Sequence, residues 1–200
     1  MSLVTITRRA LLATLLALTS SCYTLYSPSK QPQEFSRPAI AVRLASEMPP
    51  HFDSHVRCAL SRLDAVRMLP TFDEKILNGG YEFTGQPSEL STPQSVLECA
   101  RRPLNLEWTA RHCPWVPVWP FKREVGSTYY SAEGVWKMKT YDCEITAQDT
   151  GELAGHFLHE HMHTCGYVDG EGNKDGKVVT YRINKIIEDL TKQTPVCPGL

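Results

Sequence analysis

The clearest periodic pattern in the chain lies in residues 150–165. At 100° per residue, apolar side chains collect on one side of a helix and three histidines on the other. Asp149 and Glu152 have capping-box spacing before the pattern, and Gly166 is typical of the position just past a helix end. The apolar positions are Leu153, Phe157, Leu158, Met162 and Cys165, and the histidines are His156, His159 and His163. The pattern therefore predicts a helix with a core face and a histidine face.

Three other stretches have helical spacing. Residues 53–69 begin with a capping residue, Asp53, and keep the spacing until Pro70. A shorter helix is expected after Thr92 and Pro93, and a last one near the C-terminus. Their apolar faces consist of Val56, Leu60, Leu63 and Val66, of Val96, Leu97 and Cys99, and of Ile183, Ile186, Ile187 and Leu190.

Residues 104–145 have a different character, rich in Trp, Tyr, Val and Thr and interrupted by Pro and Gly. Alternation over 128–131 and 135–140 predicts short strands that form a small sheet. The four tryptophans cluster here, which favours a buried core. Together these patterns predict one α+β domain over residues 40–200, with the sheet on one side and the 150–165 helix beneath a cleft.

Composition and charge exclude two classes of protein. Of the 200 residues, 42% are hydrophobic and 22% charged, which is enough apolar material for a packed core and unlike a disordered chain. Lys and Arg total 21 against 22 Asp and Glu, a net charge of -1. The chain lacks the basic excess that binds phosphate backbones, so nucleic acid is not an expected partner.

The first 22 residues have the layout of an export signal. Arg8 and Arg9 precede an apolar run over 10–18 that is too short to span a bilayer, and small residues follow it up to Cys22. We expect residues 1–21 to be removed from the mature protein. The paired arginines also fit a twin-arginine signal, and both export routes stay open.

Residues 18–22 resemble a bacterial lipobox, in which the cysteine becomes the lipid-modified first residue. Residues 22–39, rich in Pro, Ser and Gln, then form a tether from a membrane anchor at Cys22. Of seven cysteines, six remain to form up to three disulfides of unspecified pairing: Cys58, Cys99, Cys113, Cys143, Cys165 and Cys197. We expect a lipid-anchored protein of the bacterial cell envelope, or a secreted or periplasmic one if Cys22 is not lipidated.

Residues 159–163 read H-E-H-M-H and fit the pattern H-E-x-x-H. On a helix His159 and His163 are one turn apart, so both imidazoles can reach one metal ion at the roughly 2.0–2.1 Å that zinc requires. A glycine at 166 can turn the chain so that Asp169 reaches the same ion. We therefore expect Zn²⁺ on His159, His163 and Asp169, with Glu160 beside the open coordination position as general base.

This extended motif resembles the metzincin branch of the zincin metallopeptidases, in the form whose third ligand is aspartate. The resemblance covers residues 150–190 and implies a zincin-like single domain with a small twisted sheet. It also implies a zinc-dependent endopeptidase whose polypeptide substrate lies along a strand edge of residues 104–145. One departure is the floor of the site, because the family has a methionine there and no methionine follows Met162. Residues 178–181 occupy that region, and Tyr181 either faces the metal or packs in the core.

Two other carboxylates compete with Asp169 as the third ligand. Asp175 fits a zincin pattern in which the aspartate comes later, and Glu188 fits a layout with a glutamate on the last helix, although its side chain projects away from that helix's apolar face. Two other functions also stay open. One is a non-catalytic envelope lipoprotein that binds a metal or a partner, and the other is a zinc amidase that acts on cell-wall peptides.

Overall fold

The computed structural model describes residues 33–37, 40–44, 50–81, 83, 86, 88–111, 126–169, 178–195 and 197. The predicted signal segment 1–21, the predicted lipidation site Cys22 and the rival ligand Asp175 lie outside the described residues, as does Cys113. In the part of the chain that the structure describes, no helix is both long enough and apolar enough to cross a bilayer.

The structure contains a mixed five-stranded sheet in the order β1-β2-β3-β5-β4. Its strands are β1 (Gln33–Arg37), β2 (Ile40–Leu44), β3 (Leu104–Arg111), β4 (Gly126–Tyr130) and β5 (Trp136–Tyr141). The three inner strands are parallel, whereas β1 and β4 pair antiparallel at the two edges. With the helices, this sheet confirms the predicted α+β class.

The sheet begins earlier in the chain than the sequence patterns indicated. Strand β1 falls within the segment 22–39 that was expected to be a tether, and β2 also precedes the predicted strand region 104–145. In β2 the alternating residues Ile40 and Val42 are buried, at 1% and 0% exposure. Strand β1 is an edge strand held by backbone pairing to β2, so its polar sequence gives no hydrophobic signal.

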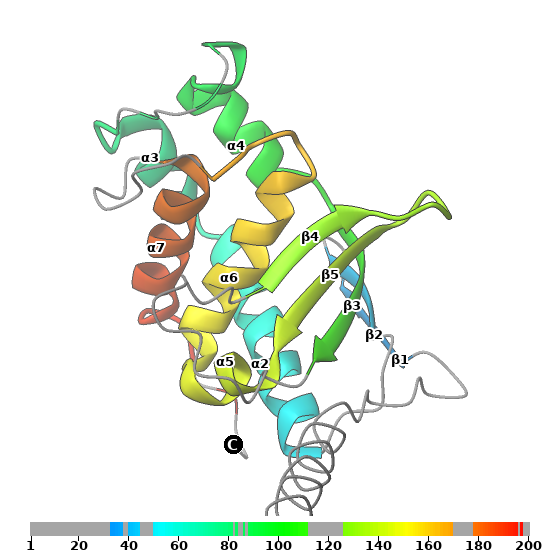
Figure 1. Cartoon of the computed structure of the whole chain (residues 1–200). Coiled ribbons are helices and arrows are strands. Elements are labelled where there is room, and N and C mark those ends of the chain that lie inside the picture. The colour runs from blue at the N-terminus through cyan, green and yellow to red at the C-terminus, as the bar shows by residue number, and fades with distance from the viewer. Residues whose placement is uncertain are drawn as a thin grey trace, which may run out of the picture.

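Figure 1 shows the helices gathered beside the sheet, with α6 running along its β4 edge. They are α2 (Pro50–Arg67), α3 (Pro70–Asn78), α4 (Pro93–Arg101), α5 (Asp142–Ala147), α6 (Thr150–His163) and α7 (Val179–Thr191), with a 3₁₀ turn at Ser88–Leu90. The predicted first helix starts three residues before Asp53. Pro70 opens α3 immediately after it, because proline fits the first turn of a helix.

The predicted starts of α4 and α6 are confirmed. The side chain of Asp149 accepts hydrogen bonds from the backbone N–H groups of Gly151 and Glu152, at 2.6 and 2.9 Å. In return the Glu152 carboxylate accepts the Asp149 N–H, which completes the capping box. Thr92 caps α4 by accepting the N–H of Ser95. Local chemistry thus fixes where the histidine helix begins.

Helix α6 is buried along most of its length and packs closely on α7. Two glycines one turn apart, Gly151 and Gly155, make this approach possible. A Cβ atom added to Gly155 would lie 2.8 Å from the backbone oxygen of Asn184, and one added to Gly151 would overlap the Thr191 hydroxyl. The residue at 155 must therefore be small for α6 and α7 to pack at this distance.

Two disulfides connect distant parts of the chain. Cys58 on α2 is bonded to Cys197, and Cys99 on α4 is bonded to Cys165 just after α6. Cys143 is disulfide-bonded as well. Disulfides of this kind persist in oxidising compartments, so they indicate an exported protein.

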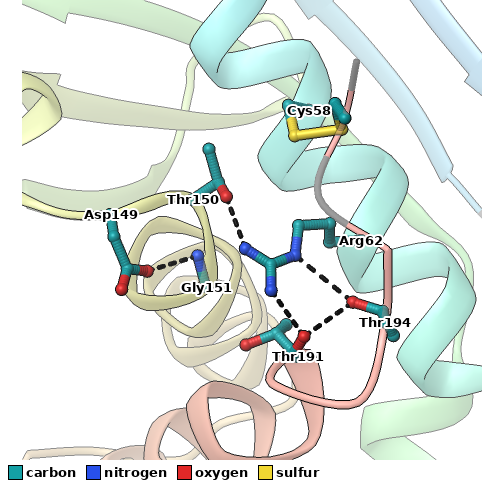
Figure 2. Close-up of a disulfide and its surroundings, with 8 residues drawn as sticks. Cys58, Arg62, Asp149, Thr150, Gly151, Thr191 and Thr194 are labelled. Atoms are coloured by element: carbon teal, nitrogen blue, oxygen red, sulfur yellow. Dashed lines mark hydrogen bonds between the residues drawn. A yellow bond between two sulfur atoms is a disulfide. The ribbon is translucent and has the colours of Figure 1, made fainter. Parts of the chain in front are cut away.

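Beside the first disulfide, the buried Arg62 of α2 binds the start of α6 and the end of α7 (Figure 2). Its guanidinium donates to the Thr150 hydroxyl at 2.6 Å, to the Thr191 carbonyl and to the Thr194 hydroxyl at 3.2 Å. Arg62 therefore joins three helices at the end of the molecule where α6 begins.

Candidate metal centre

Helix α6 presents two histidines of the H-E-x-x-H motif to the same side. The rings of His159 and His163 have centroids 5.2 Å apart and are nearly perpendicular, at 79°. His159 is buried, and the neighbouring Glu160 is only 3% exposed. This is the two-histidine geometry that the sequence spacing predicts.

The turn after α6 returns the chain to these histidines. Gly166 has φ of +92°, in the left-handed region where glycine is favoured, and its N–H donates to the His163 carbonyl at 3.0 Å. Three residues later, Oδ2 of Asp169 lies 3.5 Å from Nε2 of His159 and 3.7 Å from Nε2 of His163. The structure thus brings together the three residues that the sequence analysis selected as ligands.

The three side chains offer a donor set that can hold a metal ion. One ligand atom of each lies within 4.8 Å of the others. A tetrahedral zinc ion with ligand bonds of about 2.0–2.2 Å holds its ligand atoms about 3.3–3.6 Å apart. The two nitrogen-to-oxygen distances at Asp169 are close to that range. Two imidazoles and one carboxylate are also a ligand set that zinc takes in catalytic sites.

Hydrogen bonds orient two of these ligands. Nδ1 of His163 lies 2.7 Å from the Tyr167 carbonyl. Because a carbonyl only accepts, Nδ1 donates a proton, and Nε2 is the ring nitrogen that faces Asp169. On the other side, the Thr180 hydroxyl of α7 donates to Oδ1 of Asp169 at 2.6 Å. The histidine tautomer and the carboxylate orientation are therefore set by groups outside the cluster.

The charge of Asp169 follows from the same contacts. Partial burial opposes ionisation, but hydrogen bonds from His159 and Thr180 and the nearby imidazoles outweigh it and lower the pKa of Asp169 to about 2. The carboxylate is therefore ionised at neutral pH, the form that binds a cation.

Residues 178–181 lie against the cluster at the start of α7. Besides the Thr180 contact with Asp169, the ring of Tyr181 packs edge-on against His159, with centroids 4.7 Å apart and planes at 78°. These two side chains contact residues of the cluster, and the Tyr181 ring packs on His159 itself.

Glu160 faces the neighbouring strand and is not one of the three clustered ligands. Its Oε2 accepts a hydrogen bond of 2.7 Å from the Thr128 hydroxyl on β4, and Nδ1 of His156 lies 3.9 Å from Oε1. Burial raises the pKa of Glu160, against the lowering effects of His159 and the Thr128 hydrogen bond. A raised pKa makes the Glu160 carboxylate a stronger proton acceptor than an exposed glutamate.

His156 lies one turn before Glu160 on α6, and its side chain is next to the Glu160 carboxylate. The Trp108 indole donates to the Thr140 hydroxyl at 3.0 Å, and Thr140 lies 3.2 Å from Nε2 of His156. Thr140 accepts the indole N–H and can donate its own proton to Nε2; in that tautomer the imidazole proton is on Nδ1, the nitrogen nearer Glu160. Burial, and then the two ligand histidines, lower the pKa of His156 to about 3, so it stays neutral.

The remaining candidates of the sequence analysis lie elsewhere. Glu188 accepts hydrogen bonds from Asn184 and Lys185 of its own helix. His161 is a buried core histidine, and its Nε2–H donates to the Cys99 carbonyl at 3.2 Å. Cys99, His161 and Cys165 form a second compact group, but their two sulfurs are joined in a disulfide and therefore are not available as thiolates.

Comparison with protein-family models, curated proteins and solved structures found no match to this chain.

Several polar residues around the centre gave no signal in the sequence. Thr128, Thr140 and Thr180 come from two strands and a later helix, and Gln86 contacts Val168 from 82 residues away. No local spacing relates them to the motif, because only the packing of the sheet and α7 onto α6 brings them near it.

Proposed function

We propose that this protein is a zinc-dependent endopeptidase with a zincin-like fold. The observation that carries the proposal is the meeting of His159, His163 and Asp169 beside Glu160, a buried carboxylate outside their donor set. A metal site that only stabilises a fold has no need of a carboxylate fixed at that point. Three protein ligands leave one position of a tetrahedral ion for water or substrate, as in catalytic zinc sites.

Bound Zn²⁺ supplies Lewis acidity that polarises a carbonyl and lowers the pKa of a water toward roughly 7. Glu160 accepts a proton from the water as the water oxygen bonds to the peptide carbonyl carbon. It then delivers that proton to the amine nitrogen as the C–N bond breaks. One water is consumed, one carboxyl and one amine group form, and no bond to the protein is made.

Strand β4 offers a docking edge for an extended polypeptide. Among the described residues it pairs with β5 on one side only, and the Thr128 contact places it directly against Glu160. An edge strand presents unpaired backbone groups that can bind another strand. A substrate lying antiparallel to β4 would pass beside the proposed base.

We further propose that residues 1–21 are a signal peptide and that lipid on Cys22 anchors the protein to the bacterial cell envelope. The disulfides support export, since they require an oxidising compartment. Mass spectrometry of the mature N-terminus tests the anchor. A chain that starts at an acylated Cys22 supports it, and an unmodified N-terminus points to a secreted or periplasmic protein.

The decisive experiment uses the purified protein with casein and with peptidoglycan, each with and without a chelator. We expect cleavage of casein that a chelator abolishes and added Zn²⁺ restores. Chelator-sensitive cleavage of peptidoglycan alone would favour the zinc amidase. Zinc binding without either activity would favour a non-catalytic lipoprotein.

A further inference from the structure

Gln86 binds the backbone of Val168 with both ends of its side-chain amide. Its Nε2 donates to the Val168 carbonyl at 2.6 Å, and its Oε1 accepts the Val168 N–H at 3.0 Å. Two such bonds from one planar group reproduce the pairing that a neighbouring strand would supply. They fix both the distance and the orientation of this backbone unit.

The position of Gln86 is itself fixed from α4. Its backbone carbonyl accepts a hydrogen bond from the Ser91 hydroxyl, just before that helix. Nearby, a Cβ atom on Gly166 would lie 3.6 Å from the Leu90 side chain, so Leu90 also lies close to the turn that leaves α6. The Gln86 amide therefore reaches Val168 from a residue that Ser91 holds near the start of α4.

Val168 lies between two residues of the candidate metal centre. The carbonyl of Tyr167, on one side, accepts the Nδ1–H of His163, and Asp169, on the other, contributes the carboxylate of the cluster. The Val168 side chain is 53% exposed, so packing does not hold the backbone at this point. The two hydrogen bonds to Gln86 fix this backbone unit between Tyr167, whose side chain is buried in the core, and Asp169.

We propose that Gln86 is a positioning residue of the metal centre, and this rests on the proposed function because it takes the cluster as a zinc site. By fixing Val168, Gln86 sets the Tyr167 carbonyl that orients His163 and the backbone that carries Asp169. Two of three ligands are then in place before the ion arrives, so little conformational freedom is lost on binding.

If Gln86 only stabilised the fold, its loss would lower the global stability of the metal-free protein. The Tyr167 side chain is 1% exposed and anchors the segment in the core with or without Gln86. Loss of the amide should therefore affect residues 167–169 locally and leave the global stability of the metal-free protein nearly unchanged. The local order of this segment and the zinc affinity should change together.

The test compares Gln86→Ala with Gln94→Ala, which removes a glutamine of α4 whose amide reaches only Glu98 on the surface. Zinc affinity is measured by competition with a chromophoric chelator, and hydrogen exchange of the Val168 amide is measured without metal. We expect Gln86→Ala to raise the zinc Kd about 10- to 100-fold and to speed exchange at Val168, whereas Gln94→Ala changes neither.

Gln86→Glu refines the result, because the carboxylate can still accept the Val168 N–H but cannot donate to its carbonyl. We expect it to retain protection of the Val168 amide and to weaken zinc binding less than Gln86→Ala. A Gln86→Ala protein with wild-type zinc affinity overturns the proposal, as does one whose affinity loss is matched by the control.

Failure of the proposed function gives a different pattern. A wild-type protein that binds zinc and cleaves no peptide would refute the peptidase, while the zinc Kd of the Gln86 variants still decides this inference. A wild-type protein that binds no zinc refutes both.

Discussion

The hydroxyl of Thr128 donates a 2.7 Å hydrogen bond to Oε2 of Glu160 and so links the edge strand β4 to the motif helix α6. In the proposed mechanism this bond orients the general base and places it beside the substrate edge. The metal ligands are not involved in it. The contact therefore allows the function of the base to be tested separately from metal binding.

Thr128→Val keeps the shape of the side chain and removes this hydrogen bond. A hydrogen bond to a charged group contributes about 1.5–3 kcal/mol, so we expect kcat to fall about 10- to 150-fold while the zinc Kd stays unchanged. Thr128→Ser restores the hydroxyl and should restore most of kcat. Steady-state kinetics and a zinc titration check both variants, and equal loss in the valine and serine variants would show that the hydroxyl is not responsible.

Glu160→Gln should separate catalysis from metal binding more completely. The amide has the size of the carboxylate but cannot take a proton, so turnover should fall about a hundred- to ten-thousand-fold with zinc retained. His163→Ala removes one of the clustered donors and should lose both zinc and activity. Elemental analysis beside the peptidase assay distinguishes the two, and a Glu160→Gln protein with wild-type turnover would refute the mechanism.

Asp169→Asn tests the third ligand, because a neutral amide binds zinc less well than the ionised carboxylate whose pKa is about 2. We expect weaker zinc binding. Glu188→Gln is the matched control, since Glu188 bonds only within its own helix among the contacts described above, and it should leave zinc affinity unchanged. If Asp175→Asn loses the metal and Asp169→Asn keeps it, the third ligand has been misassigned.

The part of this centre that the sequence predicts depends on interactions between residues close together in the chain. The capping pair Asp149 and Glu152 and the glycine at 166 act over a few residues, so they set the limits of α6 and the turn that follows it. Helical periodicity then places His159 and His163 on one side. These features require no knowledge of the rest of the fold.

Long-range packing explains what the sequence did not predict. Strand β1 has no apolar face to detect and depends on backbone pairing with β2. Thr128 and Gln86 reach the centre only because β4 and the segment before α4 pack near α6. Such contacts follow from tertiary structure, and a single sequence contains no periodic trace of them.

Because His161 is buried, we expect the stability of the protein to depend on pH. Burial, and then the positive charge of Arg67, lower its pKa in the folded protein to about 4, against about 6.5 in an unfolded chain. Between these values the unfolded chain binds a proton that the folded protein does not, so the stabilisation is lost as the pH falls below about 6.5. From pH 7 to pH 5 we expect this residue to account for about 2 kcal/mol of lost unfolding free energy.

His161→Leu removes that titration and should flatten the pH dependence by the same amount. Denaturant unfolding of both proteins, with a chelator present and the disulfides intact, measures the difference. The variant also loses the hydrogen bond to the Cys99 carbonyl, which shifts its stability at every pH but not the slope. Parallel curves for the two proteins would contradict a neutral, buried His161.

Arg62 joins α2 to the start of α6 and to the end of α7, and its loss should destabilise the fold (Figure 2). Arg62→Met keeps the apolar stem in the core and removes the guanidinium, so the buried Thr150 hydroxyl loses its donor. The Thr191 carbonyl keeps its hydrogen bond from the Thr194 hydroxyl, which limits the loss of stability. We expect a loss of about 1–3 kcal/mol in the free energy of unfolding, with zinc affinity unchanged.

Arg57→Met is the control for this variant, because Arg57 pairs with Asp53 on the same helix at a partly exposed site. Such a pair contributes about 0.3–0.5 kcal/mol, so Arg57→Met should lower the free energy of unfolding several times less than Arg62→Met. Denaturant unfolding under oxidising conditions compares the two, since the Cys58–Cys197 disulfide near Arg62 must stay closed for the same unfolded state to apply. Equal destabilisation by the two substitutions would show that Arg62 contributes no more to stability than a surface ion pair.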